Sequence, residues 1–334
     1  SLRFAESLLG DEMRGAEAIV DLSKATDKPL VIYSLYAPIK PPALRRLHEA
    51  GLPVYASIEQ SVRVLRALGE RGNYLQLREQ HPREPALTPK PELGEMFARA
   101  KAEGRDLFEY EAKHLLREHG IEVPREMVVR SEAELAEVVA TFGETPLAMK
   151  VVSKDILHKS DAGGVKLNLV GEVALRRARD EILASCLAYD ARADIEGVLV
   201  APMAKQGIEV IVGVIRDPIF GPVLMFGLGG IFVEILEDVA FRSIPLSRHD
   251  AQSMVEQIKA RKILEGARGE PAVDKAALVE LLLNVSRIAA AYPELSELDL
   301  NPVIVNADGY AVVDARVIVE RDAVSHEEPQ ESVA

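Results

Sequence analysis

The residues best suited to chemistry lie in one short segment, residues 156–166, with the sequence ILHKSDAGGVK. It combines His158, two lysines, Asp161 and the adjacent Gly163 and Gly164. Glycines allow backbone N–H groups to approach phosphate oxygens, and lysines supply balancing positive charge. The segment therefore predicts a phosphate-binding loop between strands, although a Gly-Gly pair forms a simple turn equally well.

His158 is the candidate nucleophile of this loop. A neutral imidazole nitrogen can accept a phosphoryl group and pass it on, which divides one difficult transfer into two easier ones. The ordinary interpretation is an exposed loop histidine. The residue alone favours that interpretation, because the chain contains seven histidines.

Lys150 lies within LAMKVV, residues 147–152, an apolar run that is typical of a strand. An unpaired ammonium is costly to bury, so this side chain must reach a strand end or a polar cleft. A phosphate ligand meets that requirement. A lysine that extends from a strand edge into solvent meets it equally well.

Asn301 and Asp314 interrupt two apolar runs near the end of the chain. If Asp308 and Gly309 form the turn between these runs, Asp314 lies opposite Val303. Asn301 and Asp314 then share one face as diagonal neighbours. Two such oxygens can hold Mg²⁺, which also keeps water and phosphate ligands. The pattern predicts a magnesium site, and the alternative is an Asn-Pro turn with a surface aspartate.

Two further features admit both a functional and a structural interpretation. Glu209 opens the apolar run EVIVGVI and could bind a ribose hydroxyl, or it could be a solvated strand end. Residues 227–234, GLGGIFVE, combine flexible backbone with a carboxylate. That composition suits a lid or substrate loop, and also a sharp turn.

The elements that must position these residues are predicted to form an α/β fold, of the α+β type, over residues 96–322. Its helices are predicted from apolar periodicity and capping residues. They cover residues 110–119, 131–142, 172–189, 249–259 and 275–291. Strands are predicted at 147–152, 165–169, 197–203, 209–215 and 222–226, followed by a final hairpin.

Residues 1–77 read differently, as a strand, helix, strand and helix at about 29–34, 43–50, 53–55 and 57–69. Such units belong to parallel sheets with more strands, so this part predicts a fragment of a larger domain. Residues 78–95 contain four prolines and many charges, which predicts a linker. Residues 323–334 are polar and predict a disordered tail.

The composition limits the classes of partner. The 334 residues carry a formal charge of -13, which argues against a nucleic-acid partner, because phosphate neutralisation needs excess Lys and Arg. Cys186 is the single cysteine, so no internal disulfide forms and a cytoplasmic setting is expected. No apolar run predicts a membrane span. The chain starts at Ser1, from which we expect a piece of a longer product.

Several segments, in order, resemble the ATP-grasp half of NDP-forming acyl-CoA synthetases, relatives of succinyl-CoA synthetase. They are EYEAKHLLREHGIEVP, LAMKVVSKDILHKSDAGGVKLNL, GVLVAPMAKQGIEVIVGVIRDPIFGPVLMFGLGGIFVEIL, DVAFRSIPL, and ELDLNPVIV with GYAVVDARVIV. Residues 1–77 similarly resemble the end of the flavodoxin-like succinyl-CoA-ligase domain. The resemblance implies an ATP-grasp fold of two α+β subdomains, preceded by a partial flavodoxin-like βαβα segment.

The resemblance also implies roles for individual residues. Lys150 would contact ATP phosphate, Glu209 the nucleotide, and Met203 would lie at the adenine hinge. Asn301 and Asp314 would hold Mg²⁺. Together with the predicted phosphate-binding loop, the expected nucleotide-binding set is Lys150, Met203, Glu209, Asp161, Gly163 and Gly164.

For His158 the resemblance favours the nucleophile over the ordinary exposed histidine, because its loop matches the family residue by residue. It implies that His158 receives a phosphoryl group from ATP and exchanges it with a second histidine on another half of the enzyme. The family reaction is acid plus CoA plus ATP to acyl-CoA plus ADP and phosphate. We therefore expect a CoA-binding half, on a longer chain or a partner subunit, and an oligomeric assembly.

Two other functions remain open. A carboxylate–amine ligase of the ATP-grasp type would join an acyl phosphate to an amine without a phosphohistidine. A nucleotide-binding subunit without turnover is the alternative from a different class. The presence together of Lys150, His158, Asn301 and Asp314 argues against the second, because binding alone does not require all four.

Overall fold

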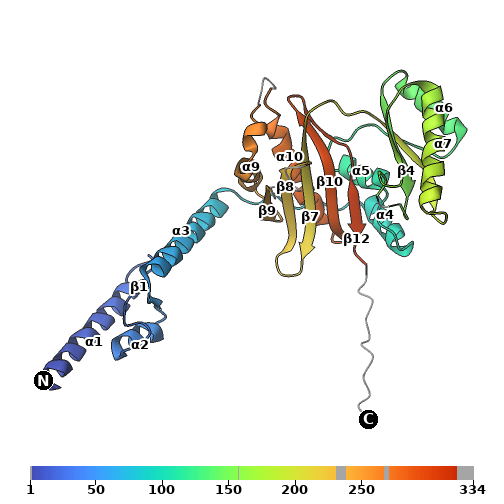
Figure 1. The fold of residues 1–334 in the computed structure, drawn as a ribbon. Coiled ribbons are helices and arrows are strands. Elements are labelled where there is room, and N and C mark those ends of the chain that lie inside the picture. Colours follow the sequence, from blue (N-terminus) through green and yellow to red (C-terminus); the bar gives the residue numbers. More distant parts are fainter. Residues whose placement is uncertain (1, 157, 231–237, 267–270, 322–334) are drawn as a thin grey trace, which may run out of the picture. The chain divides into compact units, whose positions relative to one another are not determined.

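The computed structural model describes residues 2–156, 158–230, 238–266 and 271–321 (Figure 1). It divides the chain into two compact units, Ser1–Pro82 and Arg83–Ala334. This division falls within the segment expected to be a linker, residues 78–95. Helices occupy both ends of that segment, because α3 (Ile58–Gln80) ends inside it and α4 (Pro91–Ala102) begins inside it.

Unit 1 is organised around two short parallel strands, β1 (Ile32–Tyr33) and β2 (Val54–Tyr55), with α2 (Pro42–Glu49) between them. The predicted strand, helix, strand and helix are all present. The structure corrects the helical content in two respects. A helix that was not predicted, α1 (Leu2–Lys24), precedes β1, and α3 continues past Gly69 to its end at Gln80. One helical glycine costs only about 1 kcal/mol, which is too little to end a long helix.

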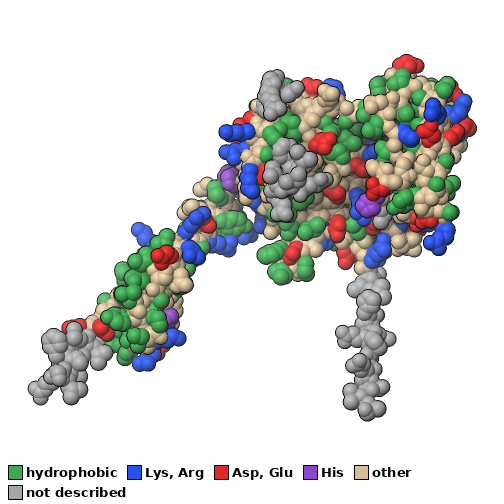
Figure 2. Space-filling model, viewed as in Figure 1, with side chains coloured by type: hydrophobic (Ala, Val, Ile, Leu, Met, Phe, Trp, Pro, Cys, Tyr) green, Lys and Arg blue, Asp and Glu red, His purple; other side chains and the backbone are tan. Residues whose placement is uncertain are grey.

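The core of unit 1 is small, and α3 carries exposed apolar side chains. The buried core residues are Ala16, Val20, Ala43, Leu47 and Leu52. Ile58, Val62, Leu65 and Leu68 of α3 are 58%, 58%, 43% and 40% exposed. Their spacing places them on one side of the helix, and Figure 2 shows apolar side chains gathered along this unit. Such a stripe is typical of a helix that packs against other elements.

The first half of unit 2 is an antiparallel four-stranded sheet in the order β3–β6–β4–β5. Its strands are β3 (Met127–Val129), β4 (Leu147–Ser153), β5 (Val165–Leu169) and β6 (Ile195–Pro202). Helices α6 (Glu132–Phe142) and α7 (Gly171–Tyr189) share a buried cluster with one face of this sheet (Figure 1). The Ser131 side chain accepts from the backbone N–H of Glu134, which confirms the predicted start of α6.

The second half of unit 2 is a six-stranded antiparallel sheet in the order β11–β10–β7–β8–β9, with β12 also paired to β10. Its strands are β7 (Ile208–Asp217), β8 (Gly221–Leu228), β9 (Val239–Ser243), β10 (Leu295–Asn306), β11 (Gly309–Val312) and β12 (Arg316–Val319). The second strand of the predicted final hairpin, YAVVDARVIV at residues 310–319, was wrong as a continuous element, because residues 313–315 separate β11 from β12.

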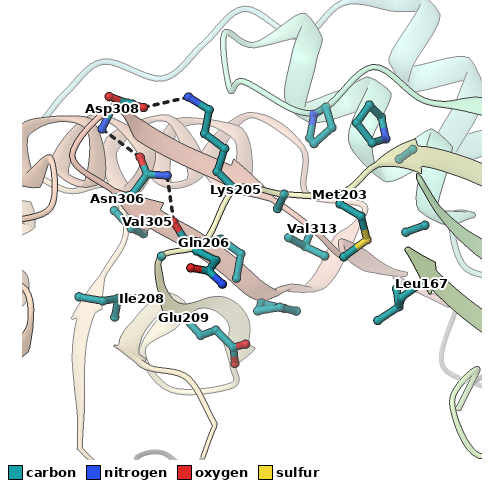
Figure 3. Close-up of a pocket in the computed structure, with 18 of the residues that line it drawn as sticks. Leu167, Met203, Lys205, Gln206, Ile208, Glu209, Val305, Asn306, Asp308 and Val313 are labelled. Atoms are coloured by element: carbon teal, nitrogen blue, oxygen red, sulfur yellow. Dashed lines mark hydrogen bonds and ion pairs between the residues drawn. The ribbon is translucent and has the colours of Figure 1, made fainter. Parts of the chain in front are cut away.

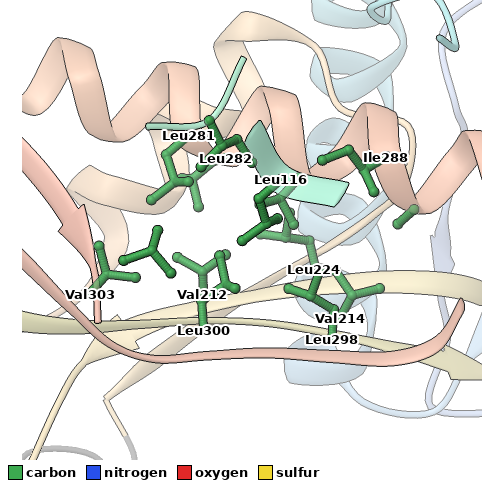
Figure 4. Packing of buried hydrophobic residues seen from close by; sticks show 14 of the residues in the cluster. Leu116, Val212, Val214, Leu224, Leu281, Leu282, Ile288, Leu298, Leu300 and Val303 are labelled. Carbon is green, nitrogen blue, oxygen red and sulfur yellow. The ribbon is translucent and has the colours of Figure 1, made fainter. Parts of the chain in front are cut away.

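Helices cover one face of this larger sheet. They are α4, α5 (Glu109–Glu118), α9 (Arg248–Gln257) and α10 (Lys275–Ala291), with a short 3₁₀ turn at Arg261–Ile263. Figure 4 shows side chains of α5 and α10 packed against β7, β8 and β10. Leu300 is fully buried there, whereas its neighbour Asn301 is exposed. Because strand side chains alternate, polar residues such as Asn301 and Glu209 lie on the opposite face.

Two predicted features lie outside the described residues in whole or in part. They are the tail at residues 323–334 and residues 231–234 of the proposed lid segment. None of the helices that the structure describes is long and apolar enough to cross a membrane.

Candidate functional site

A cavity of about 1000 Å³ lies in unit 2, lined by residues of both sheets. Three of the predicted site residues, Lys150, Met203 and Glu209, line it. Lys150 comes from β4, Glu209 from β7, and Met203 from the connection that leads from β6 to β7. The described lining does not include His158, Asp161, Gly163, Gly164, Asn301 or Asp314, although Val313 belongs to it.

Part of the lining is largely apolar and comes from a few short stretches of chain; we call this part the apolar end. Pro202 ends β6, Met203 lies in the connection to β7, and Ile208 begins β7. Ile304 comes from β10. Figure 3 shows Met203 and Leu167 on neighbouring walls of this region. The backbone N–H of Met203 donates to the carbonyl of Pro146 at 2.9 Å, which fixes the connection against the four-stranded sheet.

Glu209 projects from the start of β7 with an exposed side chain. Its carbonyl accepts from the N–H of Gly229 at 2.7 Å. A Cβ on Gly229 would lie only 3.0 Å from the Cβ of Glu209, so glycine permits this close approach. At the adjoining rim, Lys205 and Asp308 form an exposed ion pair at 2.9 Å (Figure 3).

A buried ionic cluster surrounds Glu109 of α5, and its members Glu109, Lys113 and Lys150 line the cavity; we call this cluster the ionic end. Lys150 Nζ lies 2.8 Å from Glu109 Oε1 and 2.9 Å from the carbonyl oxygen of Val313. Lys113 Nζ lies 2.9 Å from the same Glu109 oxygen. Lys159 Nζ lies 2.5 Å from Glu109 Oε2. One carboxylate therefore joins α5, β4 and the His158 loop.

Two further carboxylates complete the cluster. Lys113 also donates to Glu126 Oε2 at 2.9 Å. Glu126 Oε1 is buried without a hydrogen-bond partner among the described residues. Asp314 Oδ1 lies 3.6 Å from Lys150 Nζ and 3.5 Å from Lys159 Nζ. The Asp314 side chain is 36% exposed, so it remains accessible from outside the cluster.

Burial and the neighbouring charges shift the pKa values of the two carboxyl groups, Glu109 and Asp314, in opposite directions. Burial acts to raise the pKa of Glu109, but Lys113, Lys150 and Lys159 hold that pKa well below its usual value. Burial and the neighbouring Glu109 carboxylate raise the pKa of Asp314, against the effect of the lysines. Burial acts to lower the pKa of Lys159, yet Glu109 and Asp314 raise it overall. Glu109, Lys113 and Lys159 therefore stay charged near neutral pH.

The hairpin that carries Asn301 and Asp314 has a different turn from the predicted one. Asn306 pairs with Gly309, so the turn consists of Ala307 and Asp308. The Asn306 side chain accepts from the Asp308 N–H at 2.9 Å, and this local bond sets the turn.

The observed register differs from the predicted one by two residues. Because side chains alternate with a period of two, Asn301 and Asp314 still fall on one face. Val303 pairs with Val312, and Asp299 pairs with Arg316. Between these pairs the Val313 N–H donates to the carbonyl of Pro302 at 3.1 Å, from which we infer that Asn301 lies beside Asp314. Both contribute hard oxygen donors of the kind that Mg²⁺ prefers.

The His158 loop uses its glycines for its own structure. His158 and Asp161 are exposed. The N–H of Gly163 donates to the carbonyl oxygen of Ser160, and the N–H of Gly164 donates to the carbonyl oxygen of Lys159 at 2.7 Å. Gly163 has a φ of +67°, and a Cβ on Gly164 would lie 2.6 Å from a methyl group of Val151. Turn formation and packing thus account for both glycines, and their contact with phosphate stays a prediction.

From the sequence alone, no role was predicted for Glu109, Lys113 or Glu126, and Lys159 was predicted only as positive charge in the loop. A signal was present for the first two. Glu109 and Lys113 lie four residues apart on α5, in line with the buried residues Ala112 and Leu116. Charged residues on the core side of a helix require partners, which marks them as members of a buried ionic group.

Comparison with known proteins identifies related chains. An ATP-grasp domain model matches residues 99–319. The acetate–CoA ligase [ADP-forming] I subunit beta of Pyrococcus furiosus is 47% identical over 225 residues, which are 67% of this chain and 97% of that subunit. The acetate–CoA ligase [ADP-forming] I of Archaeoglobus fulgidus is 41% identical over 82% of this chain, which spans 40% of that longer protein.

Solved structures agree with these sequence matches. Acetyl-coenzyme A synthetase 1 of Ca. Korarchaeum cryptofilum, in complex with coenzyme A and Ca-AMPCP, has a chain 44% identical to this one with a TM-score of 0.66. That match covers 68% of this chain and 99% of the other. A second structure of the same protein contains coenzyme A and Mg-AMPPCP, with its phosphohistidine segment pointing towards the nucleotide-binding site. It is 41% identical, with a TM-score of 0.60 over 68% of this chain and all of the other.

Proposed function

Because the chain belongs to the ATP-grasp family of ADP-forming acyl-CoA synthetases, we propose that it is the ATP-binding, phosphoryl-transferring part of an acid–CoA ligase. The observation that carries the proposal is the cavity with one apolar and one ionic end, with Lys150 at the ionic end. An adenine ring suits the apolar end beside Met203. The phosphates would then lie toward Lys150. Glu209 also lines the cavity and would bind a ribose hydroxyl.

The ionic end supplies charge stabilisation for phosphoryl transfer. Lys150 is held by Glu109 and the carbonyl of Val313, so its position is fixed before nucleotide arrives. Asn301 and Asp314 would hold Mg²⁺, which would share its remaining positions with phosphate oxygens and water. Asp161, Gly163 and Gly164 remain proposed neighbours of the phosphates through the loop that carries His158.

In the proposed step, an imidazole nitrogen of His158 attacks the γ-phosphorus of ATP. The bond from that phosphorus to the β–γ bridging oxygen breaks, ADP leaves, and the imidazole loses its N–H proton to water. The phosphoryl group then passes to a CoA-binding half and its second histidine. That half is carried on the same polypeptide or on a separate subunit, since relatives occur both as beta subunits and as longer chains.

Covalent labelling tests the step directly. We expect incubation with magnesium and γ-labelled ATP to place phosphate on His158, detected by mass spectrometry under alkaline conditions. The label should be acid-labile and base-stable and should persist in Ser160→Ala, a matched control in the same loop. Label that survives in His158→Ala, or that resists acid, would refute the relay role. Acid, CoA and ATP should yield acyl-CoA only when the CoA-binding half is present.

The same assay separates the two alternatives. A carboxylate–amine ligase would consume ATP with an acid and an amine and leave His158 unmodified. A binding subunit without turnover would bind Mg-ATP and release no ADP. Acid-labile phosphate on His158 contradicts both.

A further inference from the structure

Lys159 directly follows His158, yet the two side chains have opposite environments. His158 is exposed, whereas the Lys159 side chain is 22% exposed and extends into the ionic cluster. Its ammonium lies 2.5 Å from Glu109 Oε2 and 3.5 Å from Asp314 Oδ1. A residue adjacent to the candidate nucleophile is thus tied to two other segments of the site.

The far end of the same loop is fixed by packing. Gly164 lies against Val151 of β4 and Cys186 of α7, where an added Cβ would be 2.6 Å and 3.1 Å from their side-chain atoms. Its N–H donates to the carbonyl of Lys159 at 2.7 Å, and Ala162 donates to the carbonyl of His158 at 3.2 Å. These contacts close the turn. The Lys159 ammonium ties the His158 side of that turn to the opposite wall of the site.

The anchor point is itself rigid. The Glu109 side chain is 4% exposed and also accepts from Lys113 and Lys150. Consecutive Cα atoms are about 3.8 Å apart, so holding Lys159 confines His158 to a small region. The anchor therefore relates the position of His158 to that of Lys150, the proposed phosphate ligand.

We propose that Lys159 is a positioning residue for phosphoryl transfer, which holds His158 at the phosphate end of the site through its ion pairs with Glu109 and Asp314. This inference rests on the proposed function. It assigns Lys159 to the loop and not to the nucleotide. Misplacement of a reacting group by about 1 Å can slow a reaction on the order of a hundredfold without weakening substrate binding.

The experiment compares Lys159→Met and Lys159→Arg with Lys154→Met in the 334-residue chain. Lys154 is a suitable control, because it lies in the same stretch but pairs with Asp194 in an exposed position. Single-turnover labelling of His158 gives the maximal rate, and calorimetry with a non-hydrolysable Mg-ATP analogue gives the affinity.

We expect Lys159→Met to lower the maximal labelling rate at least tenfold and to change analogue affinity less than twofold. Lys159→Arg should recover most of the rate, since a guanidinium can reach the same carboxylates. Lys154→Met should match the parent. Unchanged labelling in Lys159→Met overturns the inference, and so does an equal loss of rate and affinity, which would make Lys159 a nucleotide ligand.

Hydrogen exchange separates failure of this inference from failure of the proposed function. Peptides that cover residues 158–164 should exchange faster in Lys159→Met than in Lys154→Met, whether or not His158 is phosphorylated. If the parent protein is not labelled on His158 but the loop still exchanges faster in Lys159→Met, the phosphoryl relay is refuted while the anchoring of the loop by Lys159 is retained. Equal exchange in both variants would refute the anchoring of the loop by Lys159.

Discussion

The two ends of the cavity are built in different ways. The apolar end comes from a few contiguous stretches around Met203 and Ile304. The ionic end gathers single residues from distant segments, among them Glu109, Lys150 and Lys159. Each side chain of the apolar end packs largely independently, whereas the buried charges depend on one another for compensation. Substitutions should therefore have graded effects at the first end and disproportionate effects at the second.

Charge balance sharpens this difference. Three lysines face three carboxylates in the described cluster, namely Lys113, Lys150 and Lys159 with Glu109, Glu126 and Asp314. The cluster is thus close to neutral before nucleotide arrives. A triphosphate adds negative charge beside carboxylates, and a divalent cation offsets it. The arrangement provides a physical reason to expect magnesium-dependent binding.

The largest effect is expected from Glu109→Gln. Removing one partner of a buried ion pair leaves uncompensated charge, and such changes cost about 3–5 kcal/mol of folding free energy. Denaturant unfolding of the chain measures the loss. Glu209→Gln, an exposed carboxylate of the same cavity, is the matched control and should change stability by less than about 0.5 kcal/mol.

The pH dependence of unfolding gives an independent check on Glu109. The folded-state pKa of Glu109 lies well below the ordinary value of 4.5, so its contribution to stability is complete above that pH. The contribution is lost as pH falls from 4.5 toward the folded pKa. Glu109→Gln should flatten this part of the stability profile. An unchanged profile, or a cost equal to that of Glu209→Gln, would contradict the central role of Glu109.

The next largest effect concerns the proposed metal pair. Asn301→Ala and Asp314→Ala should each weaken Mg-ATP binding about tenfold or more, the loss expected from one charge-assisted contact of about 1.5 kcal/mol. Calorimetric titration in magnesium and in excess chelator measures this. Chelator should remove most of the difference between parent and variants. Parent-like Mg-ATP affinity in both variants would exclude the pair as metal ligands. Glu297→Gln, another exposed position of β10, is the control.

A smaller effect is expected for Lys150→Met. Glu109 keeps Lys113 and Lys159 as partners in this variant, so the fold should tolerate the change better than it tolerates Glu109→Gln. The stabilisation by added Mg-ADP should fall, because ligand stabilisation follows RT ln(1 + [L]/Kd). Thermal unfolding with and without nucleotide measures it. A nucleotide-induced shift equal to that of the parent would place Lys150 outside the phosphate site.

Much of the fold could be predicted because local patterns determine it. The Ser131 cap with Glu134 set the start of α6, and the apolar run around Lys150 gave β4. The hairpin register was missed by two residues, since the Asn306 side chain moves the turn to Ala307 and Asp308. A local pattern does not reveal which of several adjacent turn residues forms the stronger bond.

The ionic end could be predicted only in part. Lys150 stood out because a charge interrupts an apolar strand. Glu109 is separated from it by 41 positions and from Asp314 by more than 200, so their contact exists only in the folded chain. Lys159 was seen as positive charge in the loop, but the direction of its side chain is set by the position of α5.

The smallest effect is expected for Met203→Ala, and it tests whether the two ends act independently. Met203 is partly buried, so truncation should cost ATP binding on the order of threefold through lost apolar contact. That loss should be the same in low and high salt, whereas the loss in Lys150→Met should shrink as salt screens the charge. Free-energy changes of independent sites add to within about 0.5 kcal/mol. We therefore expect the double variant Met203→Ala, Lys150→Met to show the sum of the two single effects in calorimetry. A larger coupling would mean that base and phosphate positions are linked through the bound nucleotide, and the division into an apolar and an ionic end would fail as a description of binding.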